Sequence, residues 1–231
     1  MNLDHLVVAA TSLAEGVAWC EATLGVTPGP GGEHPLMGTH NRLLSIASPA
    51  FPQAYLEIIA IQPGATPTLP EGNQRWFDMD FEPLQHHIAK HGPALVHWVA
   101  RVPDAHAAAQ GLLAQRLDVG RVTPASRATP QGLLQWHITL RADGHRLLGG
   151  CVPTLIQWGP THPTDAMADS GVSLQAWSLA HPQPSAVAQA LDALGGHTPP
   201  VQPGTAPTLT ATLACPKGLV RLTSPHFSTA P

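Results

Sequence analysis

The alternation of apolar and polar positions repeats one strand-then-helix unit three times along the chain. In each unit, side chains alternate at a period of two and then recur at helical spacing. Such repetition indicates a duplicated small module, so the overall architecture is inferred from the repeat first and from single elements afterwards. The three strand and helix pairs are expected over residues 3–8 and 13–25, 95–102 and 104–117, and 173–180 and 185–194.

Further strands complete each unit, and turn-forming residues separate them. The glycine-rich stretch 28–38 is predicted to be a loop, and the proline-rich stretch 62–92 a connection with one short helix near 84–91. We therefore predict an α+β fold of paired βαβββ modules enclosing a cavity, followed by a C-terminal partial third module. The predicted boundaries are 1–62 for the first module, 63–93 for the connection, 94–160 for the second module and 161–231 for the third.

Two of the three unit strands carry a histidine at the same point. His5 and His97 are 97 − 5 = 92 residues apart, a spacing that suits paired modules and is too long for a solenoid repeat. Equivalent positions of paired modules meet across a pseudo-twofold axis, so we expect the two imidazoles to meet. In the third unit Trp177 aligns with Trp98, which leaves Ala176 at the histidine position. That unit is interpreted as a structural or interface extension.

A carboxylate stands in an otherwise apolar strand. Glu57 lies in Tyr55-Leu56-Glu57-Ile58-Ile59, and burying a carboxylate without a partner is costly, so we expect a metal, a histidine or a substrate donor beside it. Together with His5 and His97 it supplies two imidazoles and one carboxylate, a set that Zn²⁺, Ni²⁺, Mn²⁺ or Fe²⁺ accepts with positions left open for substrate. Gln157 is assigned to the fourth position of such a site, as a weaker and neutral ligand.

The glycine-rich loop and the strand after it carry a second group of polar residues. The glycines allow the loop to fold over a cavity mouth, where polar side chains rarely serve packing alone. The alternative is a simple turn whose polar groups face solvent. Trp76, Trp136 and Trp158 are candidates for lining the cavity, with core packing as the alternative. The predicted substrate-binding residues are His40, Asn41, Arg42, Trp98 and Gln157, and His34 is a predicted catalytic residue beside Glu57.

Composition narrows the class of protein. The chain has 231 residues, of which only 11% are charged, and its net charge of −4 offers no basic surface for nucleic acid. A surface poor in charge favours self-association, so we expect a homodimer. The sequence has neither a long apolar stretch nor a basic hydrophobic leader, so we expect a cytoplasmic protein with a small-molecule ligand and no membrane partner. The remaining histidines, His162 among them, are interpreted as surface residues.

Five short runs match motifs of a known superfamily. They are Leu3-Asp4-His5-Leu6-Val7-Val8, Gly31-Gly32-Glu33-His34-Pro35, Gly38-Thr39-His40-Asn41-Arg42-Leu43, Tyr55-Leu56-Glu57 and Leu155-Ile156-Gln157-Trp158. The first and fourth resemble the opening module of the vicinal oxygen chelate superfamily, and the others resemble bacterial glyoxalase-like domains. The likeness is good over residues 1–160 and moderate beyond. It implies the glyoxalase, bleomycin-resistance and dioxygenase fold.

The resemblance also implies roles for single residues. His5 and Glu57 become the ligand pair of the first module and His97 the first ligand of the second, while Gln157 stands where metal-dependent members usually have glutamate. It implies an enzyme acting on a small oxygen-bearing organic substrate, with a divalent metal as Lewis acid and Glu57 or His34 moving protons. The reaction stays open between lyase, isomerase and dioxygenase. The alternative is a metal-free protein that binds or sequesters a small molecule in the same cavity.

Overall fold

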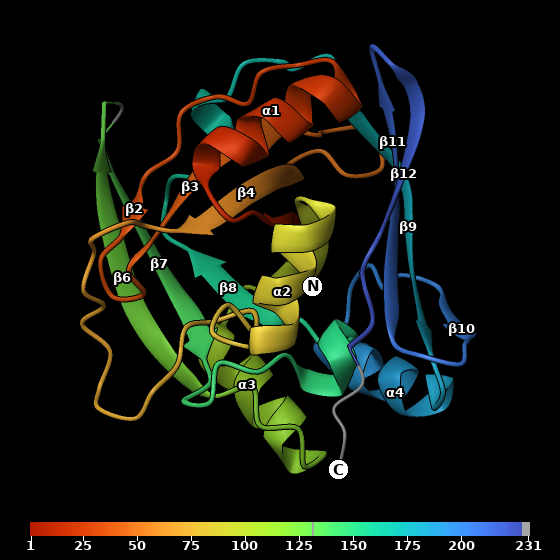
Figure 1. Cartoon of the computed structure of the whole chain (residues 1–231). Coiled ribbons are helices and arrows are strands. Elements are labelled where there is room, and N and C mark those ends of the chain that lie inside the picture. Colours follow the sequence, from red (N-terminus) through yellow and green to blue (C-terminus); the bar gives the residue numbers. More distant parts are fainter. Residues whose placement is uncertain (131, 228–231) are drawn as a thin grey trace.

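A computed structural model describes residues 1–130 and 132–227, in which the strands form an eight-stranded and a four-stranded sheet (Figure 1). The first module holds β1 (Asn2–Ala9), α1 (Leu13–Leu24), β2 (Glu33–His34), β3 (Thr39–Ser45) and β4 (Tyr55–Ile61), and α2 (Glu82–His91) follows it. The second holds β5 (Ala94–Arg101), α3 (Ala105–Ala114), β6 (Arg121–Thr129), β7 (Gly132–Leu140) and β8 (Thr154–Trp158). The remainder forms β9 (Ser173–His181), α4 (Pro184–Leu194), β10 (Val201–Pro203), β11 (Thr208–Cys215) and β12 (Gly218–Thr223), with 3₁₀ turns at Leu147–Gly150 and Pro163–Ala166.

The large sheet is built from two equivalent halves. Its order is β2-β3-β4-β1-β5-β8-β7-β6, so the same sequence of equivalent strands is met from either edge. β1 and β5 pair antiparallel at the centre, and each pairs in parallel with the last strand of its own module, β4 or β8. This confirms the predicted fold of paired modules. Two strands, β2 and β10, were not predicted from the sequence pattern. They are only two and three residues long.

The register at the centre of the sheet shows the pseudo-twofold directly. His5 pairs with Val99, and Val7 pairs with His97, so each histidine lies opposite the residue two places after the other. The pairing skips one residue on each strand, Asp4 on β1 and Val96 on β5. Both skipped residues immediately precede a histidine. Such bulges re-aim the side chains around them, and here they occur at equivalent points of the two modules.

Local signals fix the helix that covers the first module. The hydroxyl of Ser12 accepts a hydrogen bond from the Glu15 amide at 3.2 Å, and Gly25 ends α1 in the left-handed conformation with φ 79°. Cys20 and Leu24 are fully buried on the side that faces the sheet. Asp104 caps α3 in the same way, by accepting from the Ala107 amide at 3.0 Å. Each of the two helices thus begins at a side-chain cap.

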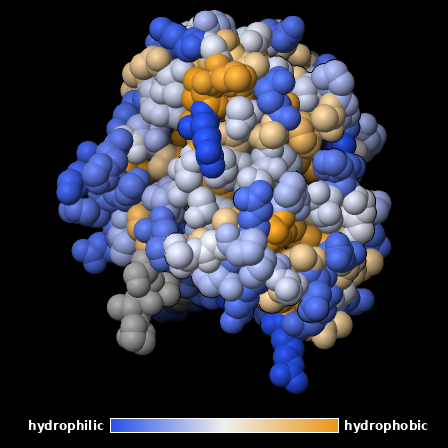
Figure 2. All heavy atoms as spheres, turned by 90° about the vertical axis from the view of Figure 1, so that its right-hand side faces the viewer, coloured by the Kyte–Doolittle hydropathy of each residue, from blue (hydrophilic) through white to orange (hydrophobic). Residues whose placement is uncertain are grey.

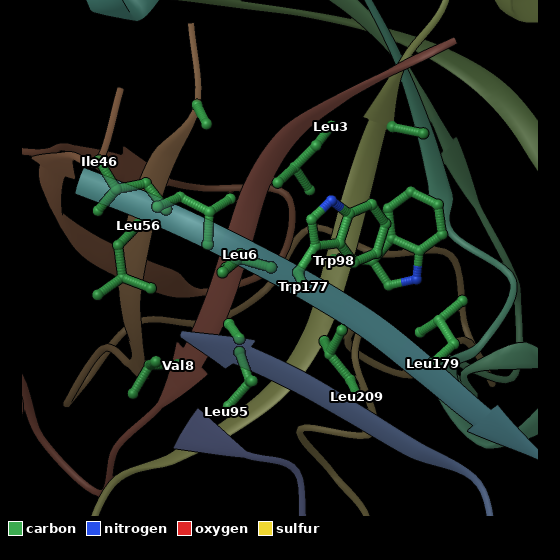
Figure 3. Close-up of a cluster of buried hydrophobic side chains, with 14 of the residues drawn as sticks. Leu3, Leu6, Val8, Ile46, Leu56, Leu95, Trp98, Trp177, Leu179 and Leu209 are labelled. Carbon is green, nitrogen blue, oxygen red and sulfur yellow. The ribbon is translucent and has the colours of Figure 1, made fainter. Parts of the chain in front are cut away.

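The main core lies between the large sheet and the four-stranded sheet. Leu6, Trp98 and Leu56 pack there against Trp177 and Leu209 of the third unit (Figure 3). The ring centroids of Trp98 and Trp177 are 4.6 Å apart, so the two aligned tryptophans contact each other. Trp98, predicted to bind substrate, is fully buried in this core and lines no cavity around Glu57. That prediction is wrong, because on β5 its side chain points to the face opposite the site.

The four-stranded sheet, in the order β10-β9-β11-β12, buries one face and exposes the other. Along β11, Leu209, Ala211 and Leu213 are buried and the threonines between them are half-buried. The face of the molecule on this side carries scattered hydrophobic residues among hydrophilic ones (Figure 2). Within the described residues no helix has the length and hydropathy needed to cross a membrane. The homodimer and the module boundaries remain predictions.

The other face of the large sheet has a smaller core. Val7, Ile59 and Val99 pack there against Leu84 and Ile88 of α2. Three tryptophans, Trp76, Trp136 and Trp158, border this core and are only half-buried. The apolar packing thus does not extend over the part of this face where β1 carries His5 and β4 carries Glu57. A cavity lies there.

Candidate functional site

A buried carboxylate forms the centre of the site. Glu57 on β4 is 5% exposed and pairs with Val7 of the neighbouring strand β1, which also carries His5. Its Oε1 accepts a hydrogen bond from Asn41 Nδ2 at 2.6 Å, and its Oε2 lies 3.5 Å from His5 Nε2. The partner expected for this carboxylate is therefore a histidine together with an amide.

The bulge in β1 supplies a second carboxylate to the same histidine. Asp4 is fully buried, and its Oδ1 accepts from His5 Nδ1 at 2.7 Å. Its Oδ2 accepts from Trp158 Nε1 at 2.9 Å and lies 3.0 Å from His162 Nε2. The ring of Tyr55 stacks on that of His5 with centroids 4.5 Å apart. His5 is thus held between two carboxylates and against an aromatic ring.

These contacts decide the protonation of the site. Burial alone would lower the pKa of His5, but the hydrogen bonds and charges of Asp4 and Glu57 outweigh it and raise the pKa to about 9. Burial would raise the pKa of Glu57, but His5 outweighs it, with help from Asn41, and holds that pKa below its ordinary value. The pKa of Asp4 is likewise held far below its ordinary value, against burial, by His162 and His5. At neutral pH the site therefore contains one imidazolium between two carboxylates.

His34 joins the site from β2 in the opposite state. Its Nδ1 lies 3.1 Å from Thr39 Oγ1, and its Nε2 lies 4.0 Å from Glu57 Oε1 and 3.4 Å from Asn41 Nδ2. Burial lowers the pKa of His34 to about 4, with Arg127 adding to the effect, although Glu57 acts against it. At neutral pH His34 is therefore a neutral imidazole next to an ionised carboxylate. The structure therefore brings together His5, His34, Asn41 and Glu57 of the predicted set.

These groups line a small cavity of about 40 Å³, which can hold a few water molecules. Aromatic and aliphatic side chains line the rest of this cavity. Trp76, Trp136 and Trp158 are among them, so these tryptophans lie where cavity-lining residues were expected. A larger cavity of about 420 Å³ shares Leu43, Arg127 and Pro163 with it. Another, of about 400 Å³, shares His34, Trp76, Trp136 and Ile138. The buried carboxylate is therefore flanked by spaces large enough for an organic molecule.

His97 lies apart from this site. Its Nε2 accepts a hydrogen bond from the Thr154 amide at 3.2 Å, its ring lies 5.3 Å from that of Phe77, and it lines a different cavity from Glu57. Burial lowers the pKa of His97 well below its ordinary value, and Arg146 and His5 add to the effect. The expected meeting of the two imidazoles at one site does not occur, because each histidine turns toward the last strand of its own module.

The predicted ligand set consequently does not fit a metal ion as the residues stand. His97 is separated from the other two, and both nitrogens of His5 already face carboxylates. Within the described part of the chain, no three histidine, cysteine, aspartate or glutamate side chains are grouped so as to hold an ion.

The fourth position of the paired site belongs to Thr154. Val99 pairs with Thr154 as Val7 pairs with Glu57, so the register makes Thr154 the counterpart of Glu57. Gln157, assigned to this position from the sequence, lies on the other face of β8 and accepts the Ala105 amide at the start of α3 at 2.9 Å. Gln157 therefore does not lie at the position predicted for it beside Glu57, because an offset of three residues on a strand with period two places it on the opposite face.

Strand alternation also separates the three polar residues of β3. Asn41 is buried and points into the cavity, whereas His40 is half-buried, Arg42 is exposed, and neither lines the cavity. The predicted contacts of His40 and Arg42 with substrate are not supported by this placement. Successive side chains on a strand face opposite sides of the sheet, so only every second residue of β3 can reach a ligand in the cavity.

Four residues of the site were not predicted from the sequence, namely Asp4, Tyr55, Arg127 and His162. Tyr55 and His162 surround the His5 and Asp4 pair, and Arg127 lies between the two cavities that meet at Leu43. The alternation in β4 places Tyr55 on the same face as Glu57 and could have revealed it. The role of Asp4 depends on the bulge, His162 comes from a distant connection, and Arg127 from the edge strand β6, so no local signal marks them.

Comparison with known proteins identifies the family of this chain. A model of the glyoxalase-like domain matches residues 3–195. A hypothetical protein from Staphylococcus aureus is 13% identical, with a TM-score of 0.55 over 96% of this chain and 88% of that one. Methylmalonyl-CoA epimerase from Mycobacterium tuberculosis is 18% identical, with a TM-score of 0.39 over 72% of this chain and 92% of that one. These likenesses concern the fold alone, and no curated protein matches. The chain thus belongs to the glyoxalase-like domain family, as its motifs predict.

Proposed function

We propose that this chain is an enzyme that moves a proton at a carbon next to a carbonyl group of a small organic substrate, with Glu57 as the base. The observation that supports this most strongly is the buried, ionised Glu57 beside a histidinium that is itself held by a second carboxylate. Structural carboxylates are usually left in water or paired once. A carboxylate between an imidazolium, a neutral imidazole and a cavity is an arrangement suited to acid–base chemistry.

Glu57 takes the proton from the substrate carbon. Asn41 holds Oε1 at 2.6 Å and so fixes the carboxylate plane, while Oε2 faces the cavity that it shares with His5. Removing this proton places negative charge on the carbonyl oxygen of the substrate. The lowered pKa of Glu57 keeps this carboxylate ionised, and so able to accept a proton, at neutral pH.

His5 stabilises the charge that develops on the substrate oxygen. Its Nδ1 proton is committed to Asp4 at 2.7 Å, whereas its Nε2 lies 3.5 Å from Glu57, longer than a charge-assisted hydrogen bond. The Nε2 proton is therefore available to an oxygen in the cavity. A charged donor fixed in advance in an apolar enclosure is the usual source of oxyanion stabilisation.

His34 offers a second place for the proton. Its neutral Nε2 lies 4.0 Å from Glu57 Oε1, and a single water can bridge such a gap. A proton received by Glu57 can pass to His34 and return to the opposite face of the substrate, or leave. Superfamily members often use a divalent metal, but the predicted ligand set does not fit one, so each step is assigned to side chains of this chain.

Hydrogen exchange into D₂O tests the proposal. We expect the protein to accelerate exchange at C3 of a 2-oxo acid such as 4-methyl-2-oxovalerate, or at the carbon of dihydroxyacetone, as followed by proton NMR. Glu57→Gln should reduce the rate about 100-fold or more. The matched control Glu71→Gln replaces an exposed carboxylate that lines none of these cavities and should leave the rate unchanged.

Two outcomes would reject the proposal. One is exchange no faster than in buffer for every carbonyl compound tested, while calorimetry still shows that one of them binds. That result would favour the metal-free sequestering protein. The other is exchange that survives Glu57→Gln. Repeating the assay with a chelator, and with Zn²⁺, Ni²⁺ and Mn²⁺ added separately, reports whether a metal takes part.

A further inference from the structure

Arg127 lies at the border of two cavities. It projects from β6, the edge strand of the second module, and lines both the cavity of Glu57 and the neighbouring cavity of about 420 Å³. It is close enough to the site to oppose protonation of His34 and to favour ionisation of Tyr55. The positive charge of Arg127 is thus placed where a molecule in the larger cavity would approach Glu57.

The guanidinium of Arg127 is partly buried and has no carboxylate partner among the described residues. Arg75, Arg141 and Arg146 each form an ion pair with an aspartate. Among the described residues Arg127 forms none, and its Nε is buried without a hydrogen-bond partner. An arginine offers five donors in a planar fork, and leaving the buried Nε without a hydrogen-bond partner is unfavourable. A ligand that accepts hydrogen bonds would complete this group.

The glycine-rich loop makes room for this arginine. A Cβ added at Gly32 would overlap the guanidinium group of Arg127, so the side chain lies directly over the loop backbone. The Gly32 amide donates to Asn41 Oδ1 at 2.8 Å, and Asn41 Nδ2 in turn donates to Glu57. One loop therefore positions both the cation and the carboxylate, on opposite sides of Asn41.

The positive charge of Arg127 suits one class of substrate. Asp4 and Glu57 contribute two negative charges and His5 one positive charge, so Arg127 supplies the positive charge that balances these three groups. Arginine binds carboxylates and phosphates through two parallel hydrogen bonds. The wall of the larger cavity is mainly apolar and includes Leu43, Leu134, Pro130 and Met167.

We infer that Arg127 binds an anionic oxygen head group, a carboxylate or a phosphate, of the substrate. The apolar remainder of the molecule occupies the larger cavity, and the head group lies at the border. The adjacent carbonyl carbon then enters the cavity of Glu57. Only this last placement rests on the proposed function; the binding of the anion by Arg127 stands without it.

Calorimetric titration with matched probes tests the inference. The probes are 4-methyl-2-oxovalerate, its uncharged methyl ester, and monobutyl phosphate, and the two anions distinguish a carboxylate head group from a phosphate. We expect at least one anion to bind about tenfold or more tightly than the ester. Arg127→Met should abolish this preference. Arg121→Met, an exposed position on the same strand that lines neither cavity, should preserve it.

Gly32→Ala is a second test that leaves the charge in place. The backbone of Gly32 is outside the left-handed region, so alanine can adopt it, and the added methyl should displace only the end of a flexible side chain. We expect weaker anion binding with little change in melting temperature. Equal affinity for ester and anions, no saturable binding of either anion, or an anion preference that survives Arg127→Met would overturn the inference.

The two proposals can fail separately. If the anion preference depends on Arg127 but no carbonyl compound exchanges hydrogen, the proposed function fails and the inference stands. If Glu57-dependent exchange is observed but the ester binds as tightly as the acid, the inference fails and the proposed function stands. Binding of the anions to Glu57→Gln should persist, because that variant keeps Arg127.

Discussion

His5 and His97 occupy equivalent positions in the two modules but have opposite chemistry. Each follows a bulge, and each lies beside the residue two places after the other in the central strand pair. The pKa of His5 is raised to about 9, whereas that of His97 is lowered well below its ordinary value. Since the backbone surroundings match, the difference must come from side chains.

Two substitutions between the modules account for this difference. The bulge residue is Asp4 in the first module and Val96 in the second, so only His5 receives a carboxylate at Nδ1. The residue facing Nε2 is Glu57 in the first and Thr154 in the second. Consistently, His97 Nδ1 is buried and has no partner among the described residues. The two modules thus share one backbone frame, and these two side chains, together with the charge of Arg146 near His97, decide which half carries the charge.

The equivalent position in the second half contacts the segment that connects the two modules. Arg146 pairs with Asp78 at 2.6 Å and also donates to the carbonyl of Val96, the residue before His97. The ring of Phe77 lies against His97. Phe77 and Asp78 both have positive φ, so this segment is held in a strained conformation by its contacts with the second module. The position that carries the charged site in one half secures a connecting segment in the other.

The largest expected effect comes from replacing the two residues that face the histidines. Glu57→Gln should slow hydrogen exchange by about 10²–10⁴, the usual contribution of a positioned base. Thr154→Val, its counterpart, should change the rate less than about threefold, because it lies in another cavity. The measurement is the exchange rate in D₂O. Equal losses for both variants would show that the two halves form one site.

The second-largest effect is expected from replacing the residue at each bulge, Asp4 or Val96. Asp4→Val should destabilise the protein by about 3 kcal/mol or more in urea unfolding, because it removes one of the two carboxylates that pair with the buried His5 and the acceptor of Trp158 and His162. Val96→Thr, which changes the counterpart with little change in shape, should cost about 1 kcal/mol. If Asp4→Val does not fold, Asp4→Asn keeps the shape and should still lower the pKa of His5. An unchanged pKa in Asp4→Asn would refute the role of the bulge.

The pH dependence of stability should also distinguish the halves. The raised pKa of His5 stabilises the folded state fully below pH 6.5, and this contribution is lost as the pH rises from 6.5 through about 9. Its full size is about 3 kcal/mol. His97 has the opposite sign, so its contribution is present above pH 6.5 and is lost as the pH falls. His5→Gln should flatten the alkaline limb of the urea-unfolding profile, and His97→Gln only the acid limb. Identical profiles for both variants would contradict the assignment.

The smallest effect is expected at Gln157. Because its side chain accepts the Ala105 amide at the start of α3, Gln157→Glu keeps that bond and adds a negative charge at a helix N-terminus. Stability should change by no more than about 0.5 kcal/mol, and Ni²⁺ affinity by calorimetry should not rise. A gain in metal affinity would mean that Gln157, and not Thr154, faces the site.

The sequence predicts the frame better than the site. Periodicity, caps and the repeat locate the strands and helices, because those signals are local. Glu57, His5, Asn41 and His34 could be found as polar residues in an apolar strand or beside glycines. The separation of His97 could not, since it depends on which way each histidine turns after its bulge. Arg127 could not either, because it reaches the site from an edge strand.

Imidazole ¹⁵N shifts of His5 and His97, followed from pH 5 to 10, test the asymmetry of the two halves most directly. Spectra of His5→Gln and His97→Gln assign the two rings. At pH 7.5 we expect His5 to be protonated on both nitrogens, and to titrate near 9. His97 should be neutral, with its proton on Nδ1, because its Nε2 accepts the Thr154 amide. If both rings titrate together near 6.5, the two half-sites are alike and the account is wrong.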